Sequence, residues 1–177
     1  MVFLRFSGCN LKCPFCDTDH SGYREMDAGE IVAEILKAGG DCRRVCVTGG
    51  EPSLQLDKAL VDALHGAGFQ VHVETNGTRP LPEGVDWVTL SPKTDVKGLK
   101  GDGTVVLERA DEVKVVYEGF PVDKWAAFPA DWHFLQPCDT GNARANASIT
   151  AQCMACIQES GTPWRLSLQT HKLLNIR

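Results

Sequence analysis

The sequence has no apolar run long enough to cross a bilayer, and it lacks an excess of basic residues. Its 18 lysines and arginines are outnumbered by 23 aspartates and glutamates, which gives a net charge of −5. A broad nucleic-acid surface needs the opposite balance, because lysine and arginine neutralise the bound phosphates. The chain also begins without the basic and apolar segments of a secretion signal. We therefore expect a cytoplasmic protein that acts on a small molecule, with no nucleic-acid or membrane partner.

No internal repeat, low-complexity tract or linker interrupts the alternation of short strands and helices. We predict one domain over residues 1–177, which is long enough to bury a sizeable core. Asp27 and Glu30 have the spacing of a capping box, which predicts a helix from there to Gly39 and Gly40. Further helices are predicted at 54–65 and 147–159, and strands at 2–6, 44–47, 69–74, 87–90, 112–116, 132–136 and 165–169.

The strand and helix order, with right-handed crossovers, predicts an α/β fold with a mainly parallel sheet and helices outside it. There are too few helices for eight units, so we expect a partial, incomplete TIM-like barrel. Ligands of such folds bind at the carboxyl ends of the strands. Polar and glycine-containing motifs follow the predicted strands at 9–16, 49–52, 74–77, 91–93 and 136–137. Each alone could be an ordinary turn, but together they predict one binding rim.

Cys9, Cys13 and Cys16 follow the first predicted strand at C-x3-C-x2-C spacing. A four-iron cubane cluster is usually held by four thiolates, so three ligands leave one iron open to bind something else. Three other interpretations are a zinc knuckle completed by His20, a disulfide pair with a spare thiol, or buried cysteines. Disulfides are disfavoured because eight scattered cysteines are typical of a reducing compartment.

Residues on the rest of the rim have side chains that suit a small charged ligand. Glycine at 49 and 50 lets a backbone approach a ligand closely. Glu74 and Asn76 offer partners for an ammonium or a ribose, and Ser91 and Lys93 suit a carboxylate or a ribose. Cys153 and Cys156 share the spacing of one helix face, so we predict packing there rather than a second cluster.

The cysteine motif resembles the radical S-adenosylmethionine (SAM) superfamily, and the whole set of motifs resembles the 7-carboxy-7-deazaguanine synthases. The resemblance rests on Arg-Phe-x-Gly-Cys-Asn-Leu-x-Cys, Cys-Asp-Thr, Val-Thr-Gly-Gly-Glu-Pro, Glu-Thr-Asn-Gly, Ser-Pro-Lys, Glu-Val-Lys-Val-Val, Leu-Gln-Pro and Trp-Arg-Leu-Ser-Leu-Gln-Thr-His-Lys, in that order. The final Gln-Thr-His-Lys at 169–172 is the most specific part, because other radical SAM enzymes do not share it.

This resemblance implies a lyase that contracts the ring of 6-carboxy-5,6,7,8-tetrahydropterin to 7-carboxy-7-deazaguanine, with loss of ammonia, in queuosine biosynthesis. It implies a 4Fe-4S cluster, SAM that is regenerated, and Mg²⁺ as cofactors. A flavodoxin-like or other one-electron reductant is the implied partner, and a homodimer is one open arrangement. The alternatives are another short radical SAM enzyme, such as a glycyl-radical activase, or an iron-sulfur or zinc binding module without catalysis.

The resemblance also implies residue roles, although it identifies no catalytic residue. Cys9, Cys13 and Cys16 would hold the cluster and Thr18 the Mg²⁺. Substrate contacts are implied for Arg5, Thr48 and Arg177. SAM contacts are implied for Phe15, Asp17, Gly50, Glu74, Asn76, Ser91, Pro92, Lys93, Gln136, Pro137, Cys138 and Asp139. The residues themselves allow plainer roles: Asp17 and Thr18 as a turn cap, Arg5 as an ion-pair partner, and Gln136 as a strand-end cap.

One family feature is absent from the sequence. Family members carry a Gln-Gly-Glu-Gly segment before the first strand, and its backbone and carboxylate bind the pterin. Met1 falls where they have an interior residue. We expect that the true start lies upstream, because Val2 would otherwise begin a buried strand with no chain before it.

Overall fold

Seven parallel strands form one sheet in sequence order. The computed structural model describes residues 1–159 and 161–174. The strands are β1 (Val2–Phe6), β2 (Arg44–Gly49), β3 (Gln70–Thr75), β4 (Trp87–Leu90), β5 (Glu112–Tyr117), β6 (Trp132–Pro137) and β7 (Trp164–Leu166). All seven predicted strands are present, and the predicted parallel arrangement is confirmed.

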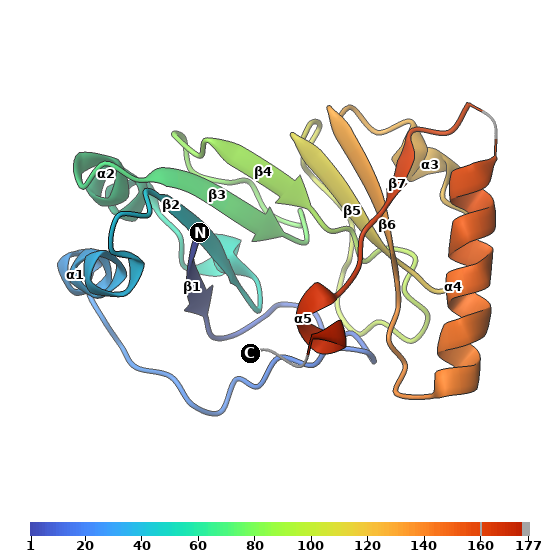
Figure 1. The fold of residues 1–177 in the computed structure, drawn as a ribbon. Helices are drawn as coiled ribbons and strands as arrows, with labels where there is room; N and C mark the ends of the chain where they lie inside the picture. Colours follow the sequence, from blue (N-terminus) through green and yellow to red (C-terminus); the bar gives the residue numbers. More distant parts are fainter. Residues whose placement is uncertain (160, 175–177) are drawn as a thin grey trace.

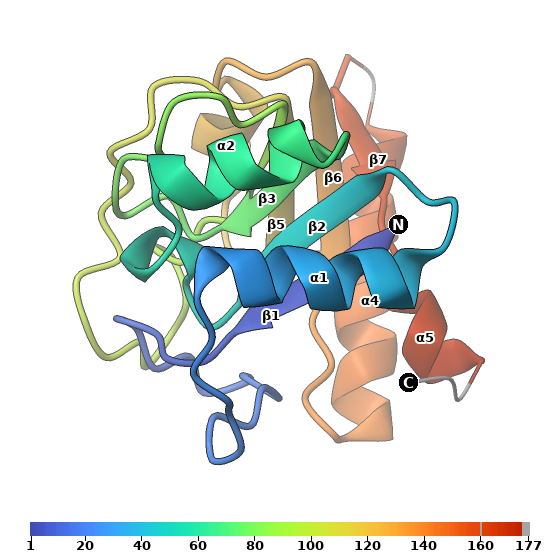
Figure 2. The same ribbon diagram turned by 90° about the vertical axis from the view of Figure 1, so that its left-hand side faces the viewer.

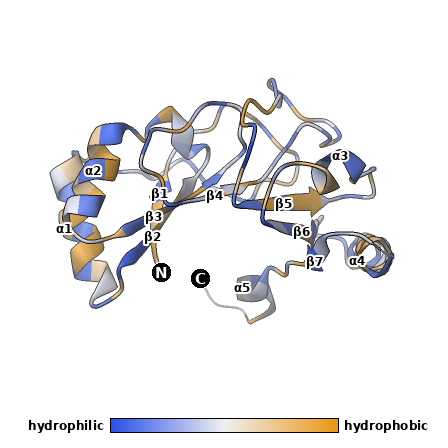
Figure 3. Ribbon diagram, turned by 90° about the horizontal axis from the view of Figure 1, so that it is seen from above, coloured by the Kyte–Doolittle hydropathy of each residue, from blue (hydrophilic) through white to orange (hydrophobic). Residues whose placement is uncertain are grey.

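The sheet curves into an open arc with helices on its convex side (Figures 1 and 3). Helices α1 (Ala28–Gly39) and α2 (Lys58–Gly66) cover the half formed by β1 to β3 (Figure 2). The short α3 (Asp123–Ala126) and the longer α4 (Ala143–Gln158) cover the other half. A one-turn helix, α5 (Thr170–Leu173), lies at the open side of the arc. β1 and β7 are the two ends of the sheet order, so the predicted partial barrel is confirmed.

The apolar core lies between the convex face of the sheet and its helices, in two clusters. One cluster joins α1 and α2 to the first three strands, and the other joins β4 to β7 with α3 and α4. Val71 and Val73 on β3 are fully buried, and a valine buried in this way contributes about 1.5–3 kcal/mol. Side chains alternate along a strand, so residues between the buried ones face the concave side. The concave side therefore carries polar side chains such as Glu74.

Two helices begin at different residues from those predicted. The predicted helix at 54–65 is split, because Pro52–Leu54 forms a 3-10 turn and α2 begins only after Asp57, whose side chain accepts a 2.9 Å bond from the Leu60 amide. α4 begins before the predicted 147, because Asn142 caps it by accepting from Ala145 at 3.0 Å. The capping box of Asp27 and Glu30 is confirmed.

The remaining differences lie at strand ends and in short helices. β2 continues to Gly49, and β7 is three residues at 164–166 rather than the predicted 165–169. The short helices α3 and α5 were not predicted. Cys153 is fully buried in the second core cluster, which confirms the predicted packing role of that helix face. No helix in the described part of the chain has the length and apolar character needed to span a membrane.

Candidate active site

A cavity of about 860 Å³ opens on the concave side of the sheet, at the carboxyl ends of the strands. Its size falls within the usual range for small-molecule sites. Most of the predicted site residues line it: Arg5, Cys9, Cys13, Phe15, Cys16, Asp17, Thr18, Thr48, Gly50, Glu74, Asn76, Ser91, Lys93, Gln136, Cys138 and Asp139. Pro92 and Pro137 belong to the same segments but are not among the lining residues. Arg177 lies outside the described residues.

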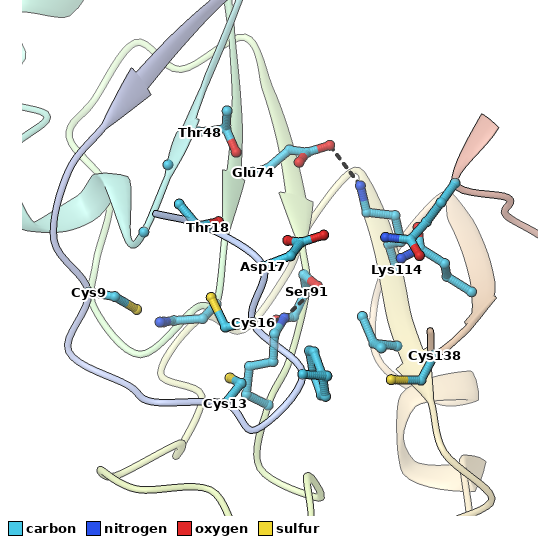
Figure 4. A pocket seen from close by; sticks show the side chains of 18 of the residues that line it. Cys9, Cys13, Cys16, Asp17, Thr18, Thr48, Glu74, Ser91, Lys114 and Cys138 are labelled. Atoms are coloured by element: carbon cyan, nitrogen blue, oxygen red, sulfur yellow. Dashed lines mark hydrogen bonds and ion pairs between the residues drawn. The ribbon is translucent and has the colours of Figure 1, made fainter. Parts of the chain in front are cut away.

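The three cysteines of the first loop lie around one part of this cavity (Figure 4). Cys9 and Cys13 are half-buried, and Cys16 is exposed. Two backbone amides of the loop donate hydrogen bonds within it: the Leu11 amide donates to the Cys9 side-chain Sγ at 3.4 Å, and the Cys16 amide donates to the Cys13 carbonyl at 3.1 Å. Burial raises the pKa of both Cys9 and Cys13, so a bound cation would be needed to stabilise their thiolates.

The donor set fits a cluster better than a single zinc ion. Within the described residues, no three His, Cys, Asp or Glu side chains are grouped closely enough to hold one metal ion. In a cubane each cysteine binds a different iron, so its ligands stand further apart than ligands of one zinc. His20 has another contact, because its Nδ1 accepts a 3.2 Å bond from the Gly8 amide. This histidine therefore contacts the backbone of the cysteine loop at Gly8.

The glycine at position 50 allows the cysteine loop to lie directly on the end of β2. The Gly50 amide donates to the Phe6 carbonyl at 3.1 Å, and the Glu51 amide donates to the Gly8 carbonyl at 2.9 Å. A side chain at Gly50 would collide with that Gly8 carbonyl. In the described chain the loop backbone makes a close approach at Gly50, and the same residue lines the cavity, so the predicted approach of a ligand stays a prediction.

Glu51 is a buried carboxylate that links three segments and was not predicted as a site residue. Its side chain is fully buried and accepts from the Ser53 amide at 3.0 Å, Thr75 Oγ1 at 2.6 Å and the Asn76 amide at 2.7 Å. Asn76 in turn donates to Asn10 Oδ1 at 3.1 Å, next to the first cysteine. The carboxylate thus joins the ends of β2 and β3 to the cysteine loop. In the sequence, Glu51 stands between Gly49-Gly50 and Pro52 at the end of a predicted strand, and this position could have indicated a structural role.

Lys114 is a second lining residue that was missed, and it pairs with Glu74 (Figure 4). Lys114 Nζ on β5 lies 2.7 Å from Glu74 Oε1 on β3, so the ion pair reaches across β4. The sequence could have indicated this position. Side chains alternate along a strand, and with Val113 and Val115 buried on the convex face, Lys114 between them must face the cavity. Glu74 was expected to offer a partner for an ammonium or a ribose, and in the structure Lys114 supplies an ammonium group to it.

Lys93 is held at the rim by its own segment. Its Nζ donates to Ser91 Oγ at 2.7 Å and to the Ser91 carbonyl at 2.6 Å. Burial lowers the pKa of Lys93 to about 8, and the nearby Cys13 opposes this shift. The predicted pair of Ser91 and Lys93 is therefore preassembled as one hydrogen-bonded unit.

Arg5 and Thr48 lie side by side on the concave face. They are paired in the register of β1 and β2, so their side chains project from the same side of the sheet. Arg5 also borders a smaller recess of about 270 Å³, together with Asp17, Thr18 and Asp19. Within residues 1–159 and 161–174, Arg5 makes no ion pair.

Lys172 from the tail meets two carboxylates of the rim. Its Nζ lies 2.9 Å from Asp17 Oδ2 and 3.2 Å from Asp139 Oδ2. The Gly141 amide, the Asn146 side chain and Lys172 together lower the pKa of Asp139 to about 2. Lys172 therefore connects α5 to the cysteine loop and to the segment after β6. The Gln-Thr-His-Lys motif of the tail is specific to the family, but its sequence alone predicts no role for this lysine.

Comparison with known proteins agrees with this geometry. Residues 4–97 match the family model described as the radical SAM superfamily. A 7-carboxy-7-deazaguanine synthase of Bacteroides thetaiotaomicron is 52% identical over 176 residues, covering 99% of this chain and 87% of the relative. The enzyme of the same name from Caulobacter vibrioides is 41% identical, with 99% and 89% covered.

A solved structure is similar over almost the whole chain. The crystal structure of QueE from Escherichia coli has a TM-score of 0.67 and 28% identity, and the match covers 94% of this chain and 84% of that one. The precursor-bound structure of SuiB from Streptococcus suis, at 16% identity and a TM-score of 0.58, shares the fold alone. The full-length relatives and the three-cysteine cavity lead to one assignment: this chain belongs to the 7-carboxy-7-deazaguanine synthase family of the radical SAM superfamily.

Proposed function

We propose that this protein is a radical SAM lyase that converts 6-carboxy-5,6,7,8-tetrahydropterin to 7-carboxy-7-deazaguanine in queuosine biosynthesis. The observation that carries the proposal is the sharing of one cavity by the cysteine triad and the neighbouring Arg5 and Thr48. A site for electron delivery and a site for an anionic ring are thereby adjacent.

Cys9, Cys13 and Cys16 would hold the 4Fe-4S cluster that radical SAM enzymes use. When bound, the cluster supplies one electron to SAM, which starts the radical reaction. Two of the thiols are half-buried, Cys16 is exposed, and all three line the cavity. The SAM-binding side chains would come from the rest of the rim: Phe15, Asp17, Gly50, Glu74, Asn76, Ser91, Lys93, Gln136, Cys138 and Asp139. Pro92 and Pro137 would shape the backbone of the same segments.

Arg5 would bind the substrate carboxylate or the edge of the pterin ring. Its planar guanidinium offers two parallel N–H groups, which match a carboxylate. Thr48, its neighbour across the β1–β2 pair, would add a hydroxyl contact. Arg177, at the end of the chain, would complete the substrate contacts. Together these groups would orient an anionic ring with the reacting carbon towards the cysteine side of the cavity.

Thr18 would help to hold Mg²⁺ beside the substrate. It shares the smaller recess with Asp17 and Asp19, and oxygen atoms are the ligands that Mg²⁺ prefers. A hydroxyl is a weak ligand, so waters and substrate oxygens would complete the coordination. We further propose a one-electron reductant such as a flavodoxin, a cytoplasmic location, a single domain over residues 1–177 and a homodimer.

The reaction itself tests the proposal. Anaerobically reconstituted and reduced protein, given 6-carboxytetrahydropterin, SAM and Mg²⁺, should form 7-carboxy-7-deazaguanine over many turnovers per SAM. Deuterium from the abstracted position of the substrate should appear in recovered SAM, because a regenerated cofactor returns a hydrogen. Stoichiometric cleavage of SAM without a deazapurine product would contradict the proposal and favour another radical SAM activity.

A further inference from the structure

The ion pair of Lys114 and Glu74 lies on the sheet floor of the cavity, next to the side chains proposed to bind the substrate (Figure 4). The registers of β1 with β2 and of β2 with β3 place Arg5, Thr48 and Glu74 in one row on the concave face. Neighbouring strands are about 4.8 Å apart, so the backbones at Arg5 and Glu74 are separated by roughly 10 Å. A two-ring substrate held by Arg5 would therefore extend towards the ion pair.

Lys114 has unused bonding capacity on the cavity side. Its ammonium group carries three N–H donors, and within the described residues only the 2.7 Å bond to Glu74 Oε1 uses one of them. The second oxygen of Glu74, Oε2, accepts no hydrogen bond in the same part of the chain. Each side chain thus keeps one partner within the chain and has free positions for a ligand.

Two more titratable side chains on this face interact electrostatically with the ion pair. Cys46 on β2 is buried, and burial raises its pKa to about 11, so it is a neutral thiol at neutral pH. Glu112 lies two residues before Lys114 on β5, and burial raises the pKa of its carboxyl. Glu112 makes no ion pair within residues 1–159 and 161–174. The short contact through which Lys114 can exchange a proton is therefore the one with Glu74.

Other ionisable side chains of the described lining have other partners or other places. The two rim carboxylates share Lys172 at the open side of the sheet. Lys93 is hydrogen-bonded within its own segment and lies close to the cysteine loop. Arg5 keeps its proton, because a guanidinium is not deprotonated in proteins. Lys114 and Glu74 are thus the acid and base that stand beside the proposed substrate contacts.

We infer that Lys114 donates the proton with which the substrate nitrogen leaves as ammonia, and that Glu74 accepts the proton that the ring gives up. This inference rests on the proposed function. The carbon–nitrogen bond breaks and its electron pair leaves with the amino nitrogen, which takes one proton from the Lys114 ammonium. The neighbouring ring atom releases one proton to Glu74, and its electron pair forms the new double bond of the ring. Glu74 then returns the proton to Lys114 over 2.7 Å, so both side chains are restored and no oxidant or reductant is consumed.

The test separates hydrogen abstraction from ammonia loss in Lys114→Met and Lys114→Arg. Reduced, reconstituted protein receives substrate deuterated at the abstracted position, with SAM and pterin at saturating concentrations. Deuterium in recovered SAM reports abstraction, and ammonia and deazapurine report elimination. Lys58→Met is the matched control, because it removes a lysine that is ion-paired with Asp62 at 2.6 Å outside the cavity. Calorimetry of pterin binding and iron analysis provide readouts that are independent of turnover.

We expect Lys114→Met to form ammonia and deazapurine about 100-fold more slowly, because general acid catalysis typically contributes that much or more. Deuterium should enter SAM within about twofold of the parent rate, and quenched samples should contain a substrate isomer that retains every nitrogen. Lys114→Arg should keep its pterin affinity but show the same slow elimination, since it preserves the charge and withholds the proton. Methylammonium should partly restore deazapurine formation in Lys114→Ala. Lys58→Met should match the parent in every measurement.

Three results would overturn the inference. Deazapurine formation by Lys114→Met at the parent rate would show that the proton comes from elsewhere. Full activity of Lys114→Arg would show that the charge matters and the proton does not. Equal slowing of deuterium transfer and ammonia loss would make Lys114 a residue that positions the ligands. If Lys114→Met loses its iron, Lys114→Arg, which can keep the ion pair, decides between these outcomes. Failure of the proposed function is distinct, because the parent itself would then form no deazapurine.

Discussion

Lys172 Nζ lies 2.9 Å from Asp17 Oδ2, which joins the tail of the chain to the cysteine loop at the open side of the sheet. The same nitrogen lies 3.2 Å from Asp139 Oδ2, after β6. The two carboxylates come from opposite halves of the arc, since one follows the end strand β1 and the other follows β6, the neighbour of the other end strand. A single cation therefore bridges the gap that an incomplete barrel leaves.

The first prediction concerns this bridge. Lys172→Met should weaken SAM binding about three- to tenfold, because both rim carboxylates lose a shared donor. The free energy of unfolding should change by less than about 1 kcal/mol, since all three side chains are at least one-third exposed. Lys172→Arg should restore most of the affinity. SAM titration and denaturant unfolding measure the two effects, and an unchanged affinity would contradict a role for the bridge.

The pH dependence of that effect follows from the shifted pKa values. The pKa of Asp139 is lowered to about 2, so its contribution is complete above the ordinary carboxyl range and is lost only as the pH falls towards 2. Hydrogen bonds with Asp17 and then with Asp139 raise the pKa of Lys172 above 10.5, so its contribution is lost only at higher pH. The ratio of SAM affinities between parent and Lys172→Met should therefore be constant from about pH 5 to about pH 9.

The second prediction concerns Glu51. Glu51→Gln should lower the free energy of unfolding by about 1–3 kcal/mol, because an amide places a donor where the carboxylate accepts from Thr75 or Asn76. The loss should appear in urea unfolding of the cluster-free protein, since the three contacts of Glu51 are all within the chain. Glu108→Gln is the matched control, because Glu108 is exposed and should change stability little. Equal free energies of unfolding for the Glu51→Gln and Glu108→Gln variants would show that the buried contacts of Glu51 do not stabilise the fold.

These two residues also show where prediction from sequence stops. The strand at 87–90 and the capping box of Asp27 and Glu30 were predicted correctly, because they depend on neighbouring residues. The rim motifs were placed correctly as well, because the carboxyl ends of parallel strands meet at one edge. The partners of Glu51 and Lys172 come from segments distant in sequence, and no local pattern specifies such a pairing.

One local pattern was misleading for a physical reason. The helix predicted from residue 54 looked continuous because its apolar spacing begins there, but Pro52 starts a 3-10 turn and Asp57 caps a separate helix. At Gly50 the sequence indicated that a backbone comes close, but it did not indicate that the Gly8 carbonyl is one such neighbour. The role of Gly50 in binding SAM stays a prediction.

The third prediction concerns Mg²⁺. Thr18→Ala should raise the Mg²⁺ concentration needed for half-maximal activity by about tenfold, because it removes one oxygen ligand from the recess beside Arg5. Thr18→Ser keeps the hydroxyl and should stay close to the parent. Iron content should be unchanged in both variants. An identical Mg²⁺ dependence in Thr18→Ala and the parent would return Thr18 to the role of a turn cap.

The fourth prediction concerns the cysteine triad. Substitution of Cys9, Cys13 or Cys16 by Ala should abolish the cluster chromophore and SAM cleavage, because each thiolate would bind a different iron. Cys42→Ser is the control, since Cys42 lies outside the cavity and should leave iron and sulfide unchanged. Iron and sulfide analysis with visible absorbance provides the measurement. Full iron and sulfide in the triple Ala variant would disprove the assignment.

The fifth prediction concerns the ion pair of Lys114 and Glu74, which spans three strands within the cavity. Their side chains are 20% and 38% exposed, so part of the attraction is screened by solvent, and we expect a coupling energy of about 1 kcal/mol for stability. Lys114→Met, Glu74→Gln and the double variant form a mutant cycle for urea unfolding and for SAM affinity. If the pair acts as a unit that holds the SAM-binding rim in place, both single variants and the double variant should weaken SAM binding to a similar extent. Additive losses would instead mean that each side chain contacts the ligand independently.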